Sequence, residues 1–283
     1  MAELRTAMAT RRSKNYLTVQ KQKQVKAKNN RPNTLKADGV DITYYTDPLC
    51  CWSWALEPQW RKLLYEFGEQ INVRYCMGGL LPGWNNFHDP VNSVSRPIQM
   101  GPVWMHAAQL SGMPIDHNIW MKDPPASSYP ACVAVKCAEL QSAHFGERYL
   151  RLLREAVMIK GRNIGRQPVL IEVAEQLHQE SETFDVARFT NNLTDDTGLE
   201  AFRKDLQEVR YHNISRFPTL IIRKTGQKSM MISGHRPYQV LTETLTQISP
   251  GIQKDRIAAN HADYTSFFKS IVAREIQEGL SSI

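Results

Sequence analysis

The stretch that decides the fold is Asp47–Trp54, whose sequence is DPLCCWSW. Before it, Asp41–Tyr45 alternates β-branched and aromatic residues with polar ones, which predicts a short strand. After it, apolar residues recur at helical spacing as far as Phe67, which predicts an amphipathic helix. Pro58 lies within this helix and is expected to kink it, because proline removes one backbone donor and crowds the preceding turn. The stretch is therefore predicted to join a strand to the helix that follows.

Two cysteines, Cys50 and Cys51, stand at this junction. A cysteine at a helix N-terminus meets unpaired backbone N–H groups and the positive end of the helix dipole, and both favour the thiolate over the thiol. The thiolate is the form that attacks disulfides and electrophiles. We therefore expect Cys50 to be a nucleophile with a lowered pKa.

Three further strands and a series of helices are predicted along the rest of the chain. The strands lie at 71–76, 218–223 and 229–233. Helical patterns lie at about 131–143, 146–159, 167–178, 185–193, 198–212 and 238–248, with a last helix at about 262–278. Residues 84–130 contain scattered Pro, Asn and Asp and predict little regular structure. Four helical segments in a row between strands predict an all-helical block inserted into an α/β unit.

A second informative segment is Arg216–Thr219, which comes immediately before an apolar strand. The bond between Phe217 and Pro218 can be cis at modest cost, and a cis proline there would expose backbone groups to a bound chain. The alternative is an ordinary trans proline at the start of a strand.

Together these features resemble the DsbA family of the thioredoxin superfamily, and more closely its cytosolic branch of FrnE-like oxidoreductases and DsbA-like adapter proteins. The similarity spans about 41–248 and includes the motifs Gly78-Gly79-Leu80, Ser127–Ala131 and Gly234–Tyr238. It implies an α/β thioredoxin fold with an inserted all-helical domain. The expected organisation is a disordered basic tail at 1–38, a thioredoxin domain in two parts at 39–83 and 198–250, a mostly helical insertion at 84–197 and a C-terminal extension with a helix at 251–283.

The resemblance also implies a site. The family's Cys-x-x-Cys falls on Cys50–Ser53, so that Cys50 corresponds to the attacking cysteine and Ser53 replaces the resolving one. Pro218, preceded by Phe217, corresponds to the family's cis-proline. The expected site therefore has Cys50 and Ser53 as catalytic residues, and its substrate contacts are Cys51, Trp52, Phe217 and Pro218.

Ser53 changes what such a site can do, because a hydroxyl cannot attack a mixed disulfide. It can donate a hydrogen bond to the Cys50 thiolate and so help to keep its pKa low. Cys51 would have to form a strained ring with Cys50, and Cys76 is interpreted as a small buried hydrophobe. Cys132 and Cys137 lie on different helix faces. An external thiol such as glutathione is the expected resolver.

No other cofactor and no metal are expected, because the eight histidines show no metal-ligand spacing. Asp47 is interpreted as a cap for the turn at Pro48, with tuning of the thiol as the alternative. The first functional hypothesis is a thiol-disulfide oxidoreductase or isomerase that acts through Cys50 on a protein or on glutathione. The second is a non-catalytic adapter that binds a protein partner in the same cleft. A third resemblance, to kappa-type glutathione transferases and related isomerases, is disfavoured by the cysteine at position 50.

Charge is unevenly distributed along the chain of 283 residues. Residues 1–37 contain ten Lys or Arg against one acid, which leaves 25 basic and 27 acidic residues in the remainder. The basic tail is interpreted as solvated, with weak attachment to an anionic partner as the alternative.

Location and partners follow from what the sequence lacks. No apolar run is long enough for a membrane helix or a secretory signal, and the number of cysteines, five, is odd. We therefore expect a cytoplasmic protein with reduced thiols and without nucleic acid or membrane as partner. The sequence does not predict an oligomeric state.

Overall fold

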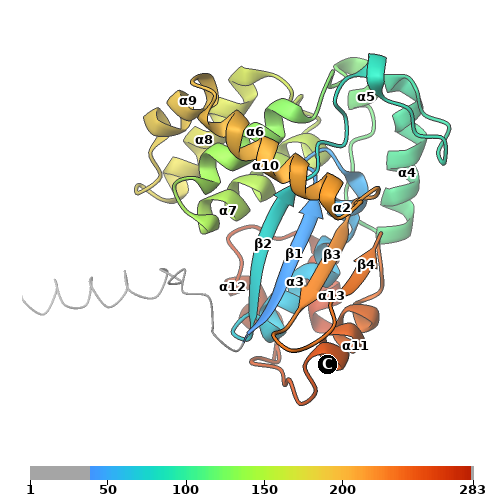
Figure 1. Ribbon diagram of the computed structural model, residues 1–283, viewed down its shortest axis with the longest axis vertical. Coiled ribbons are helices and arrows are strands. Elements are labelled where there is room, and N and C mark those ends of the chain that lie inside the picture. Colours follow the sequence, from blue (N-terminus) through green and yellow to red (C-terminus); the bar gives the residue numbers. More distant parts are fainter. Residues whose placement is uncertain (1–38, 282–283) are drawn as a thin grey trace, which may run out of the picture. The chain divides into compact units, whose positions relative to one another are not determined.

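The computed structural model describes residues 39–281, and the predicted basic tail at 1–38 lies outside the described residues. A mixed sheet is built from β1 (Val40–Thr46), β2 (Ile71–Met77), β3 (Thr219–Arg223) and β4 (Met230–Ser233), in the order β2-β1-β3-β4. β1 runs parallel to β2 and antiparallel to β3, and β3 and β4 form an antiparallel hairpin (Figure 1). All four predicted strands are present, with slightly shifted ends.

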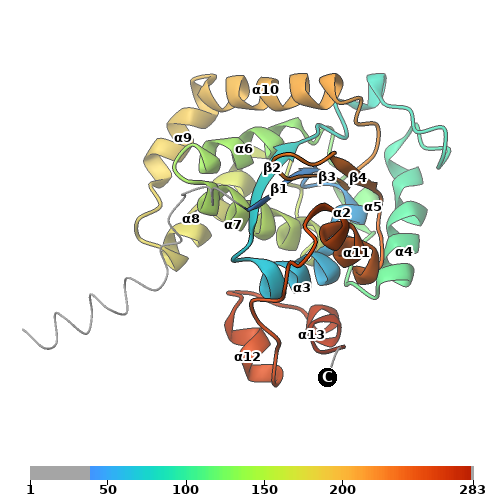
Figure 2. The ribbon, with the colours of Figure 1, turned by 60° about the horizontal axis from the view of Figure 1, so that its bottom comes forward.

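Helices cover both faces of this sheet. Ile42 and Leu220 pack on the side of α3 (Glu57–Phe67) and α11 (Tyr238–Ile248). Tyr45 and Ile221, which lie three residues and one residue further along their strands, pack on the other side against residues at the end of α10 (Thr197–Tyr211). Figure 2 shows α10 on one side of the sheet and α3 and α11 on the other. The alternation of strand side chains thus produces the three layers of a thioredoxin fold.

The insertion between β2 and α10 is mostly helical, as predicted. Its helices are α4 (Met100–Ser111), α5 (Ile119–Lys122), α6 (Tyr129–Glu139), α7 (Ala143–Arg154), α8 (Gln167–Glu180) and α9 (Val186–Thr194). Short 3-10 turns lie at Trp84–Asn86 and Pro97–Gln99, and a π-helical turn, Glu155–Ile159, follows α7. The apolar core of the insertion is continuous with Leu49 and Trp54, so the insertion packs directly on the strand–helix junction.

Three predictions about helices need correction. The helix expected up to Phe67 is two helices, α2 (Cys51–Ala55) and α3, which are separated at Leu56. Pro58 lies in the first turn of α3, where its missing N–H costs nothing. The last predicted helix is also two, α12 (His261–Ser266) and α13 (Ala273–Leu280).

The segment predicted to be irregular, 84–130, contains α4. Residues 97–115 include no Asp, Glu, Lys or Arg, so this helix lacks the polar face that makes an amphipathic pattern visible in a sequence. No helix among the described residues is long and apolar enough to span a membrane.

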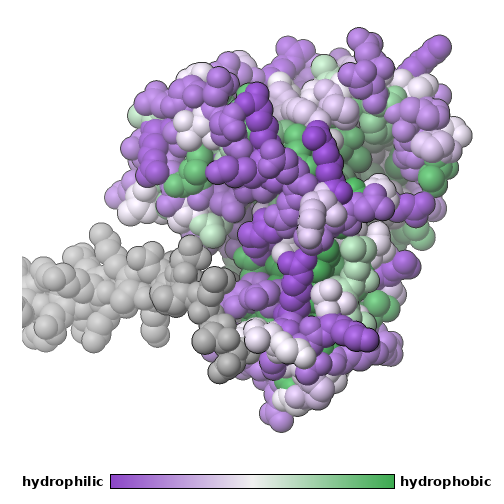
Figure 3. Space-filling view, viewed as in Figure 1, coloured by the Kyte–Doolittle hydropathy of each residue, from purple (hydrophilic) through white to green (hydrophobic). Residues whose placement is uncertain are grey.

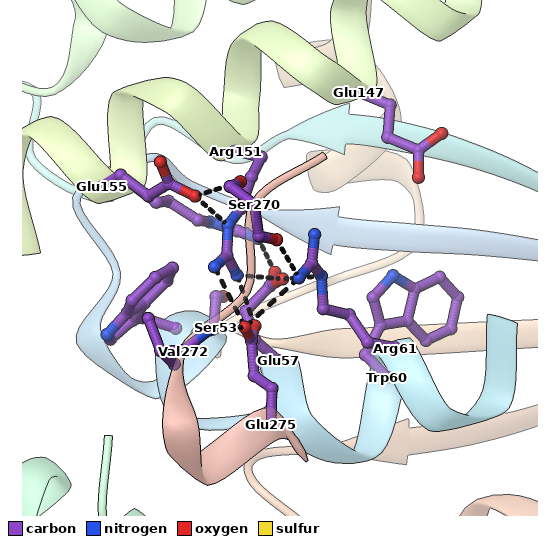
Figure 4. Close-up of polar contacts among 12 residues, drawn as sticks. Ser53, Glu57, Trp60, Arg61, Glu147, Arg151, Glu155, Ser270, Val272 and Glu275 are labelled. Atoms are coloured by element: carbon purple, nitrogen blue, oxygen red, sulfur yellow. Dashed lines mark hydrogen bonds and ion pairs between the residues drawn. The ribbon is translucent and has the colours of Figure 1, made fainter. Parts of the chain in front are cut away.

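The C-terminal extension packs on α3 through a buried cluster of charges (Figure 4). Glu275 of α13 is fully buried and lies 3.2 Å from an Arg61 guanidinium nitrogen and 3.1 Å from one of Arg151. Glu57 of α3 pairs with Arg151 and with the buried Arg154, both on α7. The extension therefore holds the thioredoxin domain and the insertion together.

Candidate functional site

Cys50 is the N-cap residue of α2, as the sequence predicts. Its Sγ accepts a hydrogen bond from the Ser53 backbone N–H at 3.4 Å and donates one to the Phe217 carbonyl oxygen at 3.5 Å. The residue is only 3% exposed. The structure thus brings the two predicted segments, 47–54 and 216–219, into direct contact at this sulfur.

The expected lowered pKa of Cys50 is wrong. Burial raises the pKa of the Cys50 thiol above its ordinary value, and the Ser53 side chain and backbone N–H offset this only in part. The positive charge of Arg154 also acts to lower it, and the carboxyl group of Asp47 acts to raise it. The helix N-terminus is present, but α2 has only five residues and the cost of removing the thiolate from water prevails.

Ser53 donates its backbone N–H to the Cys50 thiol. Ser53 Oγ is buried and has no hydrogen-bond partner within residues 39–281. The Ser53 carbonyl accepts a hydrogen bond from the Tyr44 hydroxyl at 3.4 Å. The residue is therefore held against the strand below, and both its side chain and its backbone N–H act to lower the pKa of the Cys50 thiol.

The Phe217–Pro218 peptide bond is cis. The Phe217 ring lies so close to Gly78 that a Cβ added there would be 2.0 Å from a ring carbon, which explains the glycine after β2. The Pro218 carbonyl accepts a hydrogen bond from the Gly234 N–H at 2.7 Å. Packing on one side and hydrogen bonding on the other fix the loop that faces Cys50.

Trp52 forms the half-exposed rim of the site. Its ring centroid lies 5.6 Å from that of His106 on α4 and 6.5 Å from that of His235, which follows β4. Burial lowers the pKa of His235, and the nearby Arg274 acts in the same direction. Sequence reasoning missed both histidines, because no spacing pattern links residues that meet only through the fold.

The remaining thiols lie in the interior, and all five cysteines are free. The Sγ of Cys76 donates to the Asp205 carbonyl oxygen at 3.6 Å, and the Sγ of Cys132 donates to Asp47 Oδ2 at 3.3 Å. Burial raises the pKa of Cys51 well above its ordinary value. Each thiol thus has a packing role, and none forms a disulfide with Cys50 here.

Asp47 has a larger role than the turn cap that the sequence predicts. Its Oδ1 accepts from the Leu49 N–H at 2.8 Å, which is the predicted cap. Its Oδ2 also accepts from the Leu80 N–H at 2.7 Å and from the Ser128 hydroxyl at 2.8 Å. Burial raises the pKa of this carboxyl group. Asp47 therefore ties the thiol loop to the start of α6, which local sequence signals do not reveal.

In the described part of the chain, no metal-ligand group and neither of two cavities lies at Cys50. Within residues 39–281 no group of three or more His, Cys, Asp or Glu side chains is placed to hold a metal ion. Cavities of about 280 and 310 Å³ lie between α6 and α10 and beside the loop at 123–130, and Cys50 lines neither. The Cys50 thiol itself is buried.

Comparison with known proteins identifies the same thioredoxin fold. The thioredoxin family profile matches residues 44–243. The chain belongs to the thioredoxin family. The solved structure of the cytosolic disulfide reductase DsbM of Pseudomonas aeruginosa superimposes with a TM-score of 0.56 and 20% identity, over 74% of this chain and 100% of DsbM. The two chains therefore share a fold.

The curated relatives are named as adapter proteins and not as disulfide reductases. The ClpXP adapter protein SpxH of Halalkalibacterium halodurans is 30% identical over 212 residues, which cover 74% of this chain and 68% of that protein. SpxH of Bacillus subtilis is 27% identical, over 84% of this chain and 77% of the relative. This thioredoxin-family chain is thus similar in sequence to proteins named adapters and in fold to a protein named a disulfide reductase.

Proposed function

We propose that this chain is an adapter that binds a protein partner around Cys50 and presents it to a ClpXP-type protease. The observation that carries the proposal is the state of Cys50, which is buried, has a raised pKa and lacks a second thiol at position 53. Rapid thiol exchange needs an exposed thiolate and a resolving thiol. A site without either is better suited to hold a partner than to turn over a substrate.

The similarity to proteins named ClpXP adapters supports the same reading. The surface near Cys50 offers features that a protein partner can use, since the Trp52 rim is half exposed and the Phe217–Pro218 loop is rigid. We further propose that the chain acts in the cytoplasm, because an odd number of free cysteines fits a reducing compartment.

A reconstituted degradation assay tests the proposal. Purified ClpXP would be given Spx, a probe indicated by the name of the relatives, with and without the full chain. We expect the chain to accelerate loss of Spx, and Cys50→Ser to retain that effect because the thiol itself is not consumed. No acceleration by the wild-type chain would contradict the adapter function.

Monothiol exchange is the second candidate, and the contact between Cys50 Sγ and the Phe217 carbonyl favours it, because it places the sulfur beside the loop that faces a bound chain. In that reaction the Cys50 thiolate would attack a disulfide of a protein or of glutathione. One sulfur would become bonded to Cys50 and the other would leave as a thiolate. An external thiol such as glutathione would then reduce the mixed disulfide.

Trapping experiments separate the two candidates. Mass spectrometry of the chain after exposure to glutathione disulfide would show a stable adduct on Cys50 if exchange is the function, and Cys50→Ser would abolish it. Under the adapter proposal the adduct forms slowly, and Ser53→Cys does not create efficient turnover.

A further inference from the structure

Basic residues are concentrated in one segment of the folded part of the chain. Residues 209–242 contain six Lys or Arg and no Asp or Glu, although residues 38–283 as a whole contain slightly more acids than bases. This segment comprises the end of α10, the loop before β3, the β3–β4 hairpin and the start of α11. A positive region of this length is thus a local feature and not the result of net charge.

Most of these charges have no ionic partner among residues 39–281. Arg210, Arg216, Lys228 and Arg236 are exposed and form no ion pair in the part of the chain that the structure describes. By contrast, Arg74 on β2, at the opposite edge of the sheet, pairs with Glu208. Exposed basic groups without neighbouring acids produce a positive potential that attracts anionic groups.

Two of the arginines lie beside the Cys50 site. Arg216 directly precedes Phe217, whose carbonyl contacts Cys50. Arg236 follows β4 by three residues, and this turn is tied to the same loop by the bond from the Gly234 N–H to the Pro218 carbonyl. The hydroxyl of Thr219 lies 3.1 Å from that of Ser233. The two basic positions therefore flank one rigid corner of the sheet.

Exposed apolar side chains lie on the same β3–β4 hairpin as Lys228 and on α4. Met231 on β4 is 56% exposed, and β4 pairs only with β3 in the described sheet. Across Trp52, α4 presents Met105 and Leu110, which are 43% and 61% exposed. Figure 3 shows hydrophobic side chains gathered along the flank where α4 lies in Figure 1. Exposed apolar side chains of this kind are typical of protein-binding surfaces.

We propose that the β3–β4 surface, defined here by Arg216, Lys228, Met231 and Arg236, binds an acidic segment of a protein partner that also carries apolar side chains. This inference rests on the proposed adapter function for the kind of partner and adds its chemistry. The chain's own N-terminal segment is strongly basic, and a second copy would present the same positive face, so neither is a suitable occupant. Nucleic acid could pair with the basic residues, but it would offer no apolar group to contact Met231 and the α4 residues.

Fluorescence anisotropy with the full chain tests this proposal directly. The probes are a labelled peptide of alternating glutamate and leucine, the same peptide with lysine in place of glutamate, and single-stranded DNA of similar length. We expect the glutamate peptide to bind, the lysine peptide not to bind, and binding to weaken as salt is added.

A pair of variants with equal net charge locates the binding site. Arg216→Glu/Arg236→Glu reverses two charges on the β3–β4 surface, and Lys122→Glu/Lys160→Glu reverses two exposed charges elsewhere. We expect the first to weaken binding of the glutamate peptide about tenfold or more and the second to change it little. Equal weakening by both variants, or tighter binding of the DNA than of the peptide, would overturn the inference.

The same variants separate this inference from the proposed function. If the wild-type chain binds the glutamate peptide at this surface but does not accelerate degradation by ClpXP, the adapter function is wrong and the binding surface stands. If degradation is accelerated equally by the wild type and by Arg216→Glu/Arg236→Glu, the adapter function stands and the assignment of this surface is wrong.

Discussion

Two sets of charged residues in this fold differ in their burial and in their ion pairing. The buried cluster, Glu57, Arg61, Arg151, Arg154 and Glu275, is removed from water and each member has an ionic partner. On the β3–β4 surface, Arg216, Lys228 and Arg236 are exposed and form no ion pair within residues 39–281. The ion pairs of the first set stabilise the fold. The unpaired charges of the second set can instead bind an anionic partner.

The largest effect is expected from Glu275→Ala in the buried cluster. The substitution leaves the Arg61 and Arg151 guanidinium groups buried with only part of their compensating charge. Removing one partner of a buried ion pair costs about 3–5 kcal/mol. Urea unfolding of the full chain would measure this loss. The control is Glu200→Ala, which removes an exposed ion pair with Arg203. An equal loss of unfolding free energy in the control would contradict the difference between buried and exposed charges.

A smaller effect that depends on pH is expected at Glu155. Burial opposes its charge, but the Arg151 guanidinium and the Ser270 hydroxyl hold the pKa of Glu155 below its usual range. A carboxyl group whose pKa is lowered by folding contributes stability above its unfolded pKa and loses it as the pH falls through the folded value. Glu155→Gln should therefore cost about 1.5 kcal/mol at neutral pH.

The measurement for Glu155 is the free energy of unfolding of both proteins as a function of pH. The difference between them should shrink as the pH falls below the usual range of a glutamate. A difference that stays constant with pH would show that lost packing, and not lost charge, causes the change.

The covered thiol of Cys50 provides a third test. Because burial raises its pKa, alkylation of Cys50 by iodoacetamide should be slow at neutral pH and should reach half its maximal rate at a higher pH than in the unfolded chain. Mass spectrometry of each cysteine peptide, with and without urea, measures this. Faster alkylation of Cys50 in the folded chain than in urea would contradict the covered site.

The smallest effect on stability is expected on the β3–β4 surface. Arg216→Gln and Arg236→Gln remove exposed side chains that form no ion pair in the described chain, so each should change the free energy of unfolding by less than about 0.5 kcal/mol. Thermal unfolding compares them with the wild type. A marked loss of stability would mean that these arginines serve the fold and not a partner.

Local patterns explain what the sequence predicts well. The strands alternate polar and apolar residues, and Cys50 and Pro218 stand at junctions marked by turn residues, so their positions follow from nearby sequence. Only the family resemblance places Cys50 and Phe217 in one site, because 167 residues separate the two.

Other features depend on the tertiary structure and leave no local signal. α4 has no charged face, and the packing of α13 is decided by arginines on α3 and α7. The raised pKa of Cys50 arises from neighbours that cover the sulfur, whereas the sequence shows only the favourable helix N-terminus. Burial is thus the property that sequence reasoning estimated least well.

The position of Glu275 in the chain has a consequence for synthesis. Its partners Arg61 and Arg151 precede it by 214 and 124 residues, so a ribosome makes both long before their carboxylate exists. Until α13 has been synthesised, these two guanidinium groups remain hydrated because burying them without Glu275 is unfavourable. The thioredoxin domain and the insertion therefore cannot pack fully against each other. Final consolidation of this fold is therefore expected to wait until α13 has been synthesised.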